Sequence, residues 1–148
     1  MKRPTLMTLI LCFSQIFTPA LAHGANFQKG YVLVSDNLFM VDIASDMNQS
    51  KIGLSNRNLN KENYFMVFIL DKPQKVSFWM KNTRIDLSIA FIDAENRIVE
   101  ISNLKANSLK QKSSKDNNIK YALEVPKGYF KENEIRVGIK NYYTFICN

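Results

Sequence analysis

The strongest constraint on the fold is a run of seven apolar residues at positions 64–70, Tyr-Phe-Met-Val-Phe-Ile-Leu. Seven residues are too few for a typical helix, and alternate residues of the run are apolar on both faces. A strand with two apolar faces has to be covered on both sides, so the run predicts a central strand of a sheet. The turn-forming residues 71–73 are expected to end it.

Other segments rich in β-forming residues alternate with turn residues, which predicts further strands. Residues 35–37 predict a hairpin, with Phe39, Val41 and Ile43 on its inner face. The short turn at residues 94–96 makes its two flanking strands antiparallel neighbours, and these form a meander with the strand before them. The expected strands are residues 31–34, 38–44, 76–81, 85–93, 97–102, 119–125 and 137–147.

Helix signals are few. Ser45 and Asp46 can cap a short helix that runs to Ile52, and Gly53 can end it. A second helical turn is expected at residues 129–132. About eight strands against one or two short helices predict a mainly β (α+β) fold. We expect a small antiparallel sheet that is curled or barrel-like, because an open sheet leaves unprotected edges.

The first 22 residues have the pattern of an export signal. Lys2 and Arg3 precede an apolar stretch at residues 6–17, and residues 20–22 form an Ala-Leu-Ala cleavage pattern before His23. We expect a cleaved signal peptide at 1–22 and one exported globular domain at 23–148, periplasmic or secreted. Loss of Lys2 and Arg3 lowers the net charge from +7 to +5. The remaining 126 residues contain no apolar run of the roughly 20 residues that a transmembrane helix needs.

Histidine and cysteine are too scarce for several kinds of chemistry. His23 is the only histidine, and Cys147 is the only cysteine after residue 22. A single cysteine cannot form an intramolecular disulfide, and without a second histidine neither a Ser-His-Asp nor a Cys-His arrangement is available. The acidic residues lack zinc or EF-hand spacing. The sequence therefore predicts no catalytic residue, no cofactor and no metal site.

The segment 103–118 carries four lysines against one acidic residue. Such a segment is typical of a solvated loop, and the alternative is contact with an anionic envelope surface. Nucleic acid is not expected as a partner, because aromatic residues do not alternate with these lysines.

One expected strand contains the only tryptophan. Alternation along residues 76–81 places Ser77, Trp79 and Lys81 on one face and Phe78 and Met80 on the other. A tryptophan beside hydrogen-bond donors is typical of a surface that holds a small ligand, a sugar or a peptide. The alternative is a tryptophan that covers the end of the barrel.

Several motifs, taken together, resemble an uncharacterised prokaryotic family, domain of unknown function 192, over about residues 37–140. The resemblance implies one small domain, mostly β with short helices and commonly exported, with no established reaction, cofactor or partner. Two positions depart from the family pattern, because Asp86 stands where proline is usual and Ser88 where aspartate is usual. The motifs are Gly53-Leu54, Arg57, Phe78-Trp79-Met80-Lys81-Asn82-Thr83, Ile85, Leu87, Phe91-Ile92-Asp93 and Tyr121-Ala122-Leu123-Glu124-Val125-Pro126-Lys127-Gly128.

The residues that match the family motif and can bind a ligand are Arg57, Trp79, Lys81, Asn82, Thr83 and Asp93. For Arg57 and Asp93 the alternative is an ion pair that holds the loop after the helix to the sheet. For Asn82 and Thr83 the alternative is capping of a turn.

Three classes of function remain open. The first is an exported ligand-binding or accessory module with a tryptophan-lined polar site, whose partner is an unknown small molecule. The second is a structural or interaction protein that contacts an envelope component. The third is a hydrolase-like enzyme, which would need Glu124, Asp93 or a serine and lysine pair to converge within hydrogen-bond reach. The oligomeric state is open.

Overall fold

The computed structural model describes residues 26–59 and 64–140. The expected signal peptide and residues 141–147 of the last expected strand lie outside these ranges, and both remain predictions. The elements are β1 (Gln28–Val34), β2 (Asn37–Ala44), α1 (Met47–Ile52), β3 (Met66–Gln74), β4 (Ser77–Phe78), β5 (Leu87–Asp93), β6 (Ile98–Leu104), β7 (Lys112–Ser113), β8 (Ile119–Pro126) and α2 (Tyr129–Glu132).

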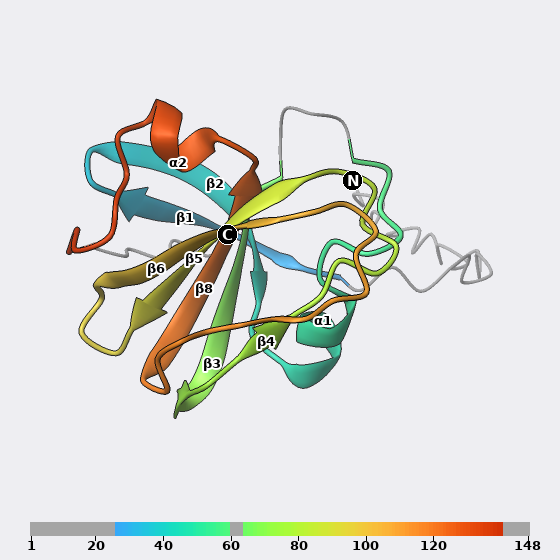
Figure 1. Cartoon of the computed structure of the whole chain (residues 1–148), viewed down its shortest axis with the longest axis horizontal. Helices are drawn as coiled ribbons and strands as arrows, with labels where there is room; N and C mark the ends of the chain where they lie inside the picture. Colours follow the sequence, from blue (N-terminus) through green and yellow to red (C-terminus); the bar gives the residue numbers. More distant parts are fainter. Residues whose placement is uncertain (1–25, 60–63, 141–148) are drawn as a thin grey trace, which may run out of the picture.

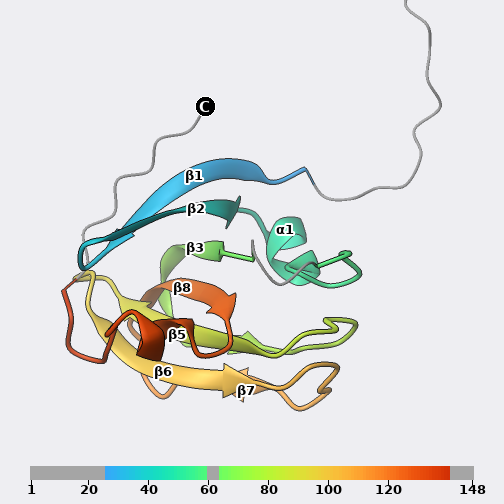
Figure 2. The ribbon, with the colours of Figure 1, turned by 90° about the horizontal axis from the view of Figure 1, so that it is seen from above.

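Six strands form the main sheet in the order β1-β2-β3-β8-β5-β6, which Figure 2 shows from top to bottom. Every neighbouring pair is antiparallel except β2 and β3, which are parallel. The mainly β class with short helices is confirmed. The sheet is mixed and is not closed into a barrel, because β1 and β6 are its two edges.

The seven-residue apolar run forms most of β3, which lies inside the sheet between β2 and β8, as predicted. Met66, Val67 and Phe68 are buried, with Val67 packing on one side of the sheet and Phe68 on the other. The expected end of the strand at residues 71–73 is wrong, because β3 continues to Gln74. The pairing of β3 with β8 is irregular between Ile69 and Gln74. Pro73 lies in this irregular part, where the strand pairing needs no backbone N–H donor, so a proline is tolerated there.

The two faces of the sheet carry separate hydrophobic clusters, and Figure 1 shows α2 on one side and α1 with β4 on the other. The first cluster, on the α2 side, contains the inner face predicted for the first hairpin. Its buried members are Val32, Val34, Phe39, Val41, Ile43, Val67, Ala90, Ile92, Ile98, Leu123, Val125, Phe130 and Ile135.

The second cluster lies between the sheet and the α1 and β4 segments. We call it the α1-side core. It consists of Ala44, Leu54, Tyr64, Met66, Phe68, Met80, Leu87, Ile89, Phe91, Leu104, Ile119 and Ala122. This side of the sheet also holds the candidate functional site.

The predicted signals of the first helix are confirmed. The Asp46 side chain accepts a hydrogen bond from the backbone N–H of Gln49 at 2.7 Å, which satisfies one of the unpaired amides of the first turn. Gly53 ends α1 with a φ of 49°, a conformation that glycine adopts without steric cost. The expected helical turn at residues 129–132 is α2.

The predicted strand at residues 76–81 is much shorter in the structure. Only Ser77 and Phe78 form β4, and they pair with β7 rather than with the main sheet. The expected three-stranded meander is therefore confirmed only for the pair of β5 and β6, because β4 does not join them. The lysine-rich segment 103–118 contains the short strand β7. Residues 137–140 form no strand and contribute one isolated bridge, between Lys140 and Arg97.

Within the described ranges, neither helix has the length and apolar character needed to cross a membrane.

A pocket on the α1 side of the sheet

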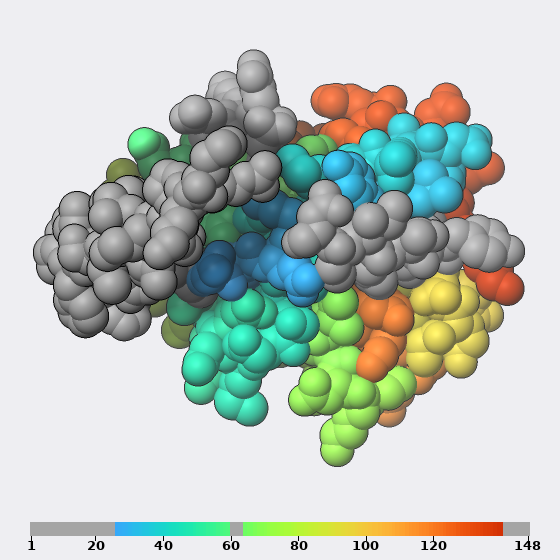
Figure 3. Space-filling view, turned by 180° about the vertical axis from the view of Figure 1, so that it is seen from behind, coloured from blue at the N-terminus to red at the C-terminus, as the bar shows by residue number. Residues whose placement is uncertain are grey.

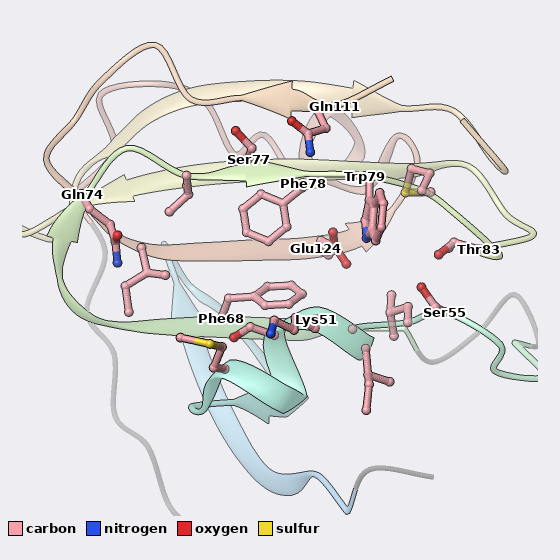
Figure 4. Close-up of a pocket in the computed structure, with 18 residues that line it drawn as sticks. Lys51, Ser55, Phe68, Gln74, Ser77, Phe78, Trp79, Thr83, Gln111 and Glu124 are labelled. Carbon is pink, nitrogen blue, oxygen red and sulfur yellow. The ribbon is translucent and has the colours of Figure 1, made fainter. Parts of the chain in front are cut away.

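A pocket of about 360 Å³ opens between α1, β3 and the segment that follows β4. Figure 3 shows a hollow between α1 in teal and the end of β3 in light green. Figure 4 shows Phe68 from β3 facing Phe78 and Trp79 from the opposite wall, with Glu124 of β8 between the two walls. The remaining lining residues are Met47, Ser50, Lys51, Ile52, Gly53, Leu54, Ser55, Leu70, Gln74, Val76, Ser77, Met80, Thr83 and Gln111.

Three aromatic rings contribute to the wall of the pocket. The rings of Phe68 and Phe78 lie 4.8 Å apart between centroids at an interplanar angle of 69°, a favourable edge-to-face contact. Trp79 is 48% exposed, and the Lys81 ammonium lies 5.6 Å from the centre of its ring. Met47 is also exposed beside the pocket. The pocket is therefore lined by a buried ring, Phe68, and by apolar side chains that solvent reaches, Trp79 and Met47.

Glu124 is the unusual residue of this pocket. Its neighbours on the adjacent strands are Met66 and Ile89, both apolar, and the residue is only 4% exposed. No hydrogen bond or ion pair joins its carboxyl group to another residue within the described ranges. Burial raises the pKa of Glu124 to about 8, so the group is mostly protonated at neutral pH.

A turn after β4 positions Trp79. The backbone N–H of Thr83 donates to the carbonyl of Met80 at 3.0 Å, and Asn82 has a φ of 58°, which asparagine tolerates better than most residues. The Ser55 hydroxyl donates to the carbonyl of Lys81 at 2.8 Å, which ties this turn to the loop after α1. Because β4 ends at Phe78, the expected alternation does not continue, and Trp79 lines the same pocket as Phe78 and Met80.

The structure brings some of the predicted site residues together. Trp79 and Thr83 line the pocket, and Lys81 lies over the Trp79 ring beside it. Asn82 is exposed in the turn, where its carbonyl accepts a hydrogen bond from the backbone N–H of Asn56 at 3.0 Å. The hydrogen bonds of Asn82 and Thr83 in this turn join backbone atoms, so within the described ranges the side chains of these two residues do not cap it. Ligand contacts of the four residues remain a prediction.

Arg57 and Asp93 lie away from the pocket, and neither is among its lining residues. Arg57 forms an ion pair with Asp42, and its guanidinium lies 4.4 Å from the centre of the Phe27 ring. Asp93 is 1% exposed and accepts hydrogen bonds from Arg97 Nε and from the Arg97 backbone N–H, both at 2.8 Å. The suggested pair between Arg57 and Asp93 is therefore not formed.

The two departures from the family pattern also lie outside the pocket. Asp86 accepts hydrogen bonds from the backbone N–H of Ala106 at 2.8 Å and from Lys127 at 2.9 Å. The Ser88 hydroxyl donates to Asn103 at 2.9 Å. Both residues are engaged in contacts within the domain rather than in the pocket.

The sequence patterns indicated Glu124 only as a possible catalytic group, and they did not indicate most of the apolar residues that line the pocket. A signal for Glu124 was available, because a glutamate within the otherwise apolar β8 segment Tyr-Ala-Leu-Glu-Val lies where side chains are expected to be buried, and buried glutamates are rare. The contribution of α1 had no comparable signal, since it depends on how the helix packs beside the sheet. In the part of the chain that the structure describes, no three His, Cys, Asp or Glu residues gather as metal ligands would.

These features define a small mainly β domain with an apolar pocket on one side of its sheet. The chain belongs to the DUF192 family, described as "Uncharacterized ACR", whose model matches residues 31–141. Three segments that carry this resemblance, at residues 53–54, 78–83 and 121–128, all contribute to the pocket. Although they are distant in the sequence, the fold places them around one cavity.

Two solved structures share the fold. One is from Sinorhizobium meliloti 1021 and is described as a proposed transcription regulator, with a TM-score of 0.73 and 24% identity over 82% of this chain and 98% of that one. The other is a protein of unknown function from Novosphingobium aromaticivorans DSM 12444, with a TM-score of 0.69 and 22% identity over 84% of this chain and 92% of that one. No curated protein matches the sequence.

Proposed function

We propose that this chain is a binding module that takes up a small molecule in the pocket on the α1 side of the sheet. The observation that carries the proposal is Glu124, a buried carboxyl group that lines the pocket and has no partner within the described ranges. A polar group held among apolar side chains is stabilised by a hydrogen-bonding or ionic partner. A ligand that pairs with Glu124 supplies such a partner, which gives the pocket a specific point of attachment.

The rest of the pocket suits a ligand that is mostly apolar. Its volume of about 360 Å³ lies in the range of small-molecule sites, which is roughly 300–1,000 Å³. The aromatic residues Phe68, Phe78 and Trp79 supply flat contact area, and serine and glutamine side chains supply a few hydrogen-bonding groups. Such a lining favours an amphipathic molecule with one polar group directed at β8.

Binding is favoured over catalysis because the candidate reactive groups do not meet. Ser77 shares a hydrogen bond of 2.7 Å with Ser113, while Lys81 lies over Trp79. Asp93 is held by Arg97 and is not part of the pocket. Glu124 thus lacks a hydrogen-bonded second group within the described ranges, whereas acid–base catalysis commonly uses two groups within reach of one substrate.

We also propose that the module acts outside the cytoplasm. The support is the basic start, apolar stretch and Ala-Leu-Ala pattern of residues 1–22. The ligand would then be a molecule of the periplasm or of the surroundings of the cell.

A thermal-shift screen tests the binding function. The purified protein is heated with a panel of small amines, carboxylates, sugars and short peptides, and a bound compound raises the midpoint of unfolding. We expect Trp79→Ala to abolish the shift, because the indole contributes wall area to the pocket. Leu109→Ala is the matched control, since Leu109 is also a large exposed apolar residue but does not line the pocket. A panel without any stabilising compound, or equal shifts in both variants, contradicts the proposal.

A further inference from the structure

One of the buried polar groups that line the pocket is an acid among apolar and aromatic side chains. Glu124 lies between Met66 and Ile89 in the sheet, and Figure 4 shows its carboxyl group directed into the space beside Phe78 and Trp79. On the same sheet face, Glu100 lies opposite Phe91 and is paired with Lys112, and Asp42 lies opposite Met66 on the far side from Glu124. Two strand spacings, roughly 10 Å, separate Asp42 from Glu124.

The cations on this side of the sheet are not placed to neutralise Glu124. Asp42 is already paired with both Arg57 and Lys29. The Lys81 ammonium lies against the Trp79 ring, and Lys81 is not among the lining residues of the pocket. The other charged or titratable groups that face this region are Lys51, on the α1 wall of the pocket, and Tyr64, in the α1-side core.

We propose that the group recognised by this pocket is a quaternary ammonium ion, held between the Glu124 carboxylate and the faces of the surrounding aromatic rings. The inference rests on the binding function proposed above and specifies the class of ligand. A cation is attracted by the face of an aromatic ring, and a ring combined with an acid binds such cations when water is excluded. Phe68, Phe78 and Trp79 provide the rings, and Glu124 provides the acid.

The strand neighbours of Glu124 carry no oxygen or nitrogen acceptor in their side chains, which favours a quaternary over a primary ammonium. A primary ammonium has three N–H donors, and each donor left unpaired in an apolar pocket costs binding free energy. The strand neighbours of Glu124, Met66 and Ile89, offer apolar side chains. A quaternary ammonium has no N–H donor, so one carboxylate and the rings satisfy it.

Cation binding is linked to release of a proton from Glu124. The carboxyl group must ionise to pair with the ligand, and burial raises its pKa to about 8. Below this pKa the affinity therefore rises about tenfold for each pH unit, since the proton competes with the cation. A neutral ligand that accepts a hydrogen bond from the protonated acid has the opposite dependence, with affinity that falls as the pH rises through the pKa.

Isothermal titration calorimetry with choline tests the inference, because the charge of choline does not change with pH. We expect the dissociation constant to fall about 50-fold between pH 6 and pH 8, as the ionised fraction of Glu124 rises. The uncharged carbon analogue 3,3-dimethylbutan-1-ol should bind at least about tenfold more weakly than choline at pH 8, since it lacks the charged contact. Glu124→Gln should remove both the tight binding and its pH dependence. Glu134→Gln, which changes an exposed glutamate outside the pocket, should leave both unchanged.

The outcomes separate this inference from the binding function. If the carbon analogue binds as well as choline, or if choline binds more weakly at pH 8 than at pH 6, the ammonium inference is wrong and the binding function stands. Equal choline binding by the wild type and Glu124→Gln also overturns it. If choline does not bind, the inference is wrong, and the thermal-shift panel decides independently whether the pocket binds another class of compound.

Discussion

Replacing Glu124 with glutamine should change how the stability of the protein depends on pH. The folded protein buries this carboxyl group, so its pKa rises from the usual 4.5 to about 8. In the unfolded chain the group is solvated and ionises near the usual value. Between these two values the folded state binds a proton that the unfolded state does not, so the free energy of unfolding falls as the pH rises.

The size of the effect follows from the shift in pKa. One unit corresponds to about 1.4 kcal/mol, so a rise from 4.5 to about 8 corresponds to about 5 kcal/mol between pH 4.5 and pH 8. The stabilising contribution is fully present below pH 4.5 and is lost as the pH rises through 8. Glu124→Gln keeps the size of the side chain and cannot ionise. We therefore expect the variant to match the wild type near pH 5 and to exceed its stability by about 4–5 kcal/mol near pH 9.

Urea denaturation at pH 5, 6, 7, 8 and 9 measures this difference. The control is Glu134→Gln, which removes an exposed carboxylate outside the pocket and should follow the wild type at every pH. If the free energies of unfolding of the wild type and Glu124→Gln keep a constant difference across this range, Glu124 ionises normally in the folded protein, and the reasoning is refuted.

Three further predictions address the core, the lysine-rich segment and export. Phe68→Ala should lower the free energy of unfolding by about 3–5 kcal/mol, because it leaves a cavity in the α1-side core. Lys72→Ala, at an exposed position on the same strand, should change it by no more than about 0.5 kcal/mol. Equal urea midpoints for the two variants contradict the core assignment. Lys112→Ala should cost about 1–3 kcal/mol at neutral pH, because the Lys112 ammonium lies 2.7 Å from the buried carboxylate of Glu100. Burial opposes ionisation of Glu100, but hydrogen bonds, led by the one from Lys112, hold the pKa of Glu100 below the usual range. An unchanged urea midpoint for Lys112→Ala argues against the ion pair. Intact-mass analysis of the protein recovered from cells should give a chain that starts at His23, and a mature chain that retains residue 1 rules out the proposed cleavage.

Local signals predicted the strands and helices well where one interaction determines them. The apolar run at residues 64–70 predicted an interior strand, because two apolar faces have no other stable environment. Asp46 and Gly53 predicted both ends of α1, since capping depends on neighbours within one turn. The sequence pattern around Lys112 suggested a solvated loop or contact with an anionic surface. It gave no sign of Glu100, because that partner comes from a strand of the main sheet.

Long-range features of the site could not be predicted in the same way. Strand alternation placed Trp79 opposite Phe78, and it failed because the chain turns after Phe78 to meet the loop after α1. The partner suggested for Arg57 was wrong because Asp42 and Asp93 are equally acidic in the sequence, and only the sheet order decides between them. Trp79 was selected as a candidate, but the pocket around it depends on α1, β3 and β8 coming together.

The position of β8 between β3 and β5 has a consequence for how the protein forms. β8 is the last strand in the described part of the chain, and it pairs with both central neighbours. Until residues 119–126 have been synthesised, the two halves of the main sheet have no strand to join them. Folding that depends on such distant pairings is slow, because the loop must close before the contacts form. The proposed export would benefit from this delay, because a chain crosses a translocation channel before it folds. Glu124 reaches the pocket only with the strand that completes the sheet.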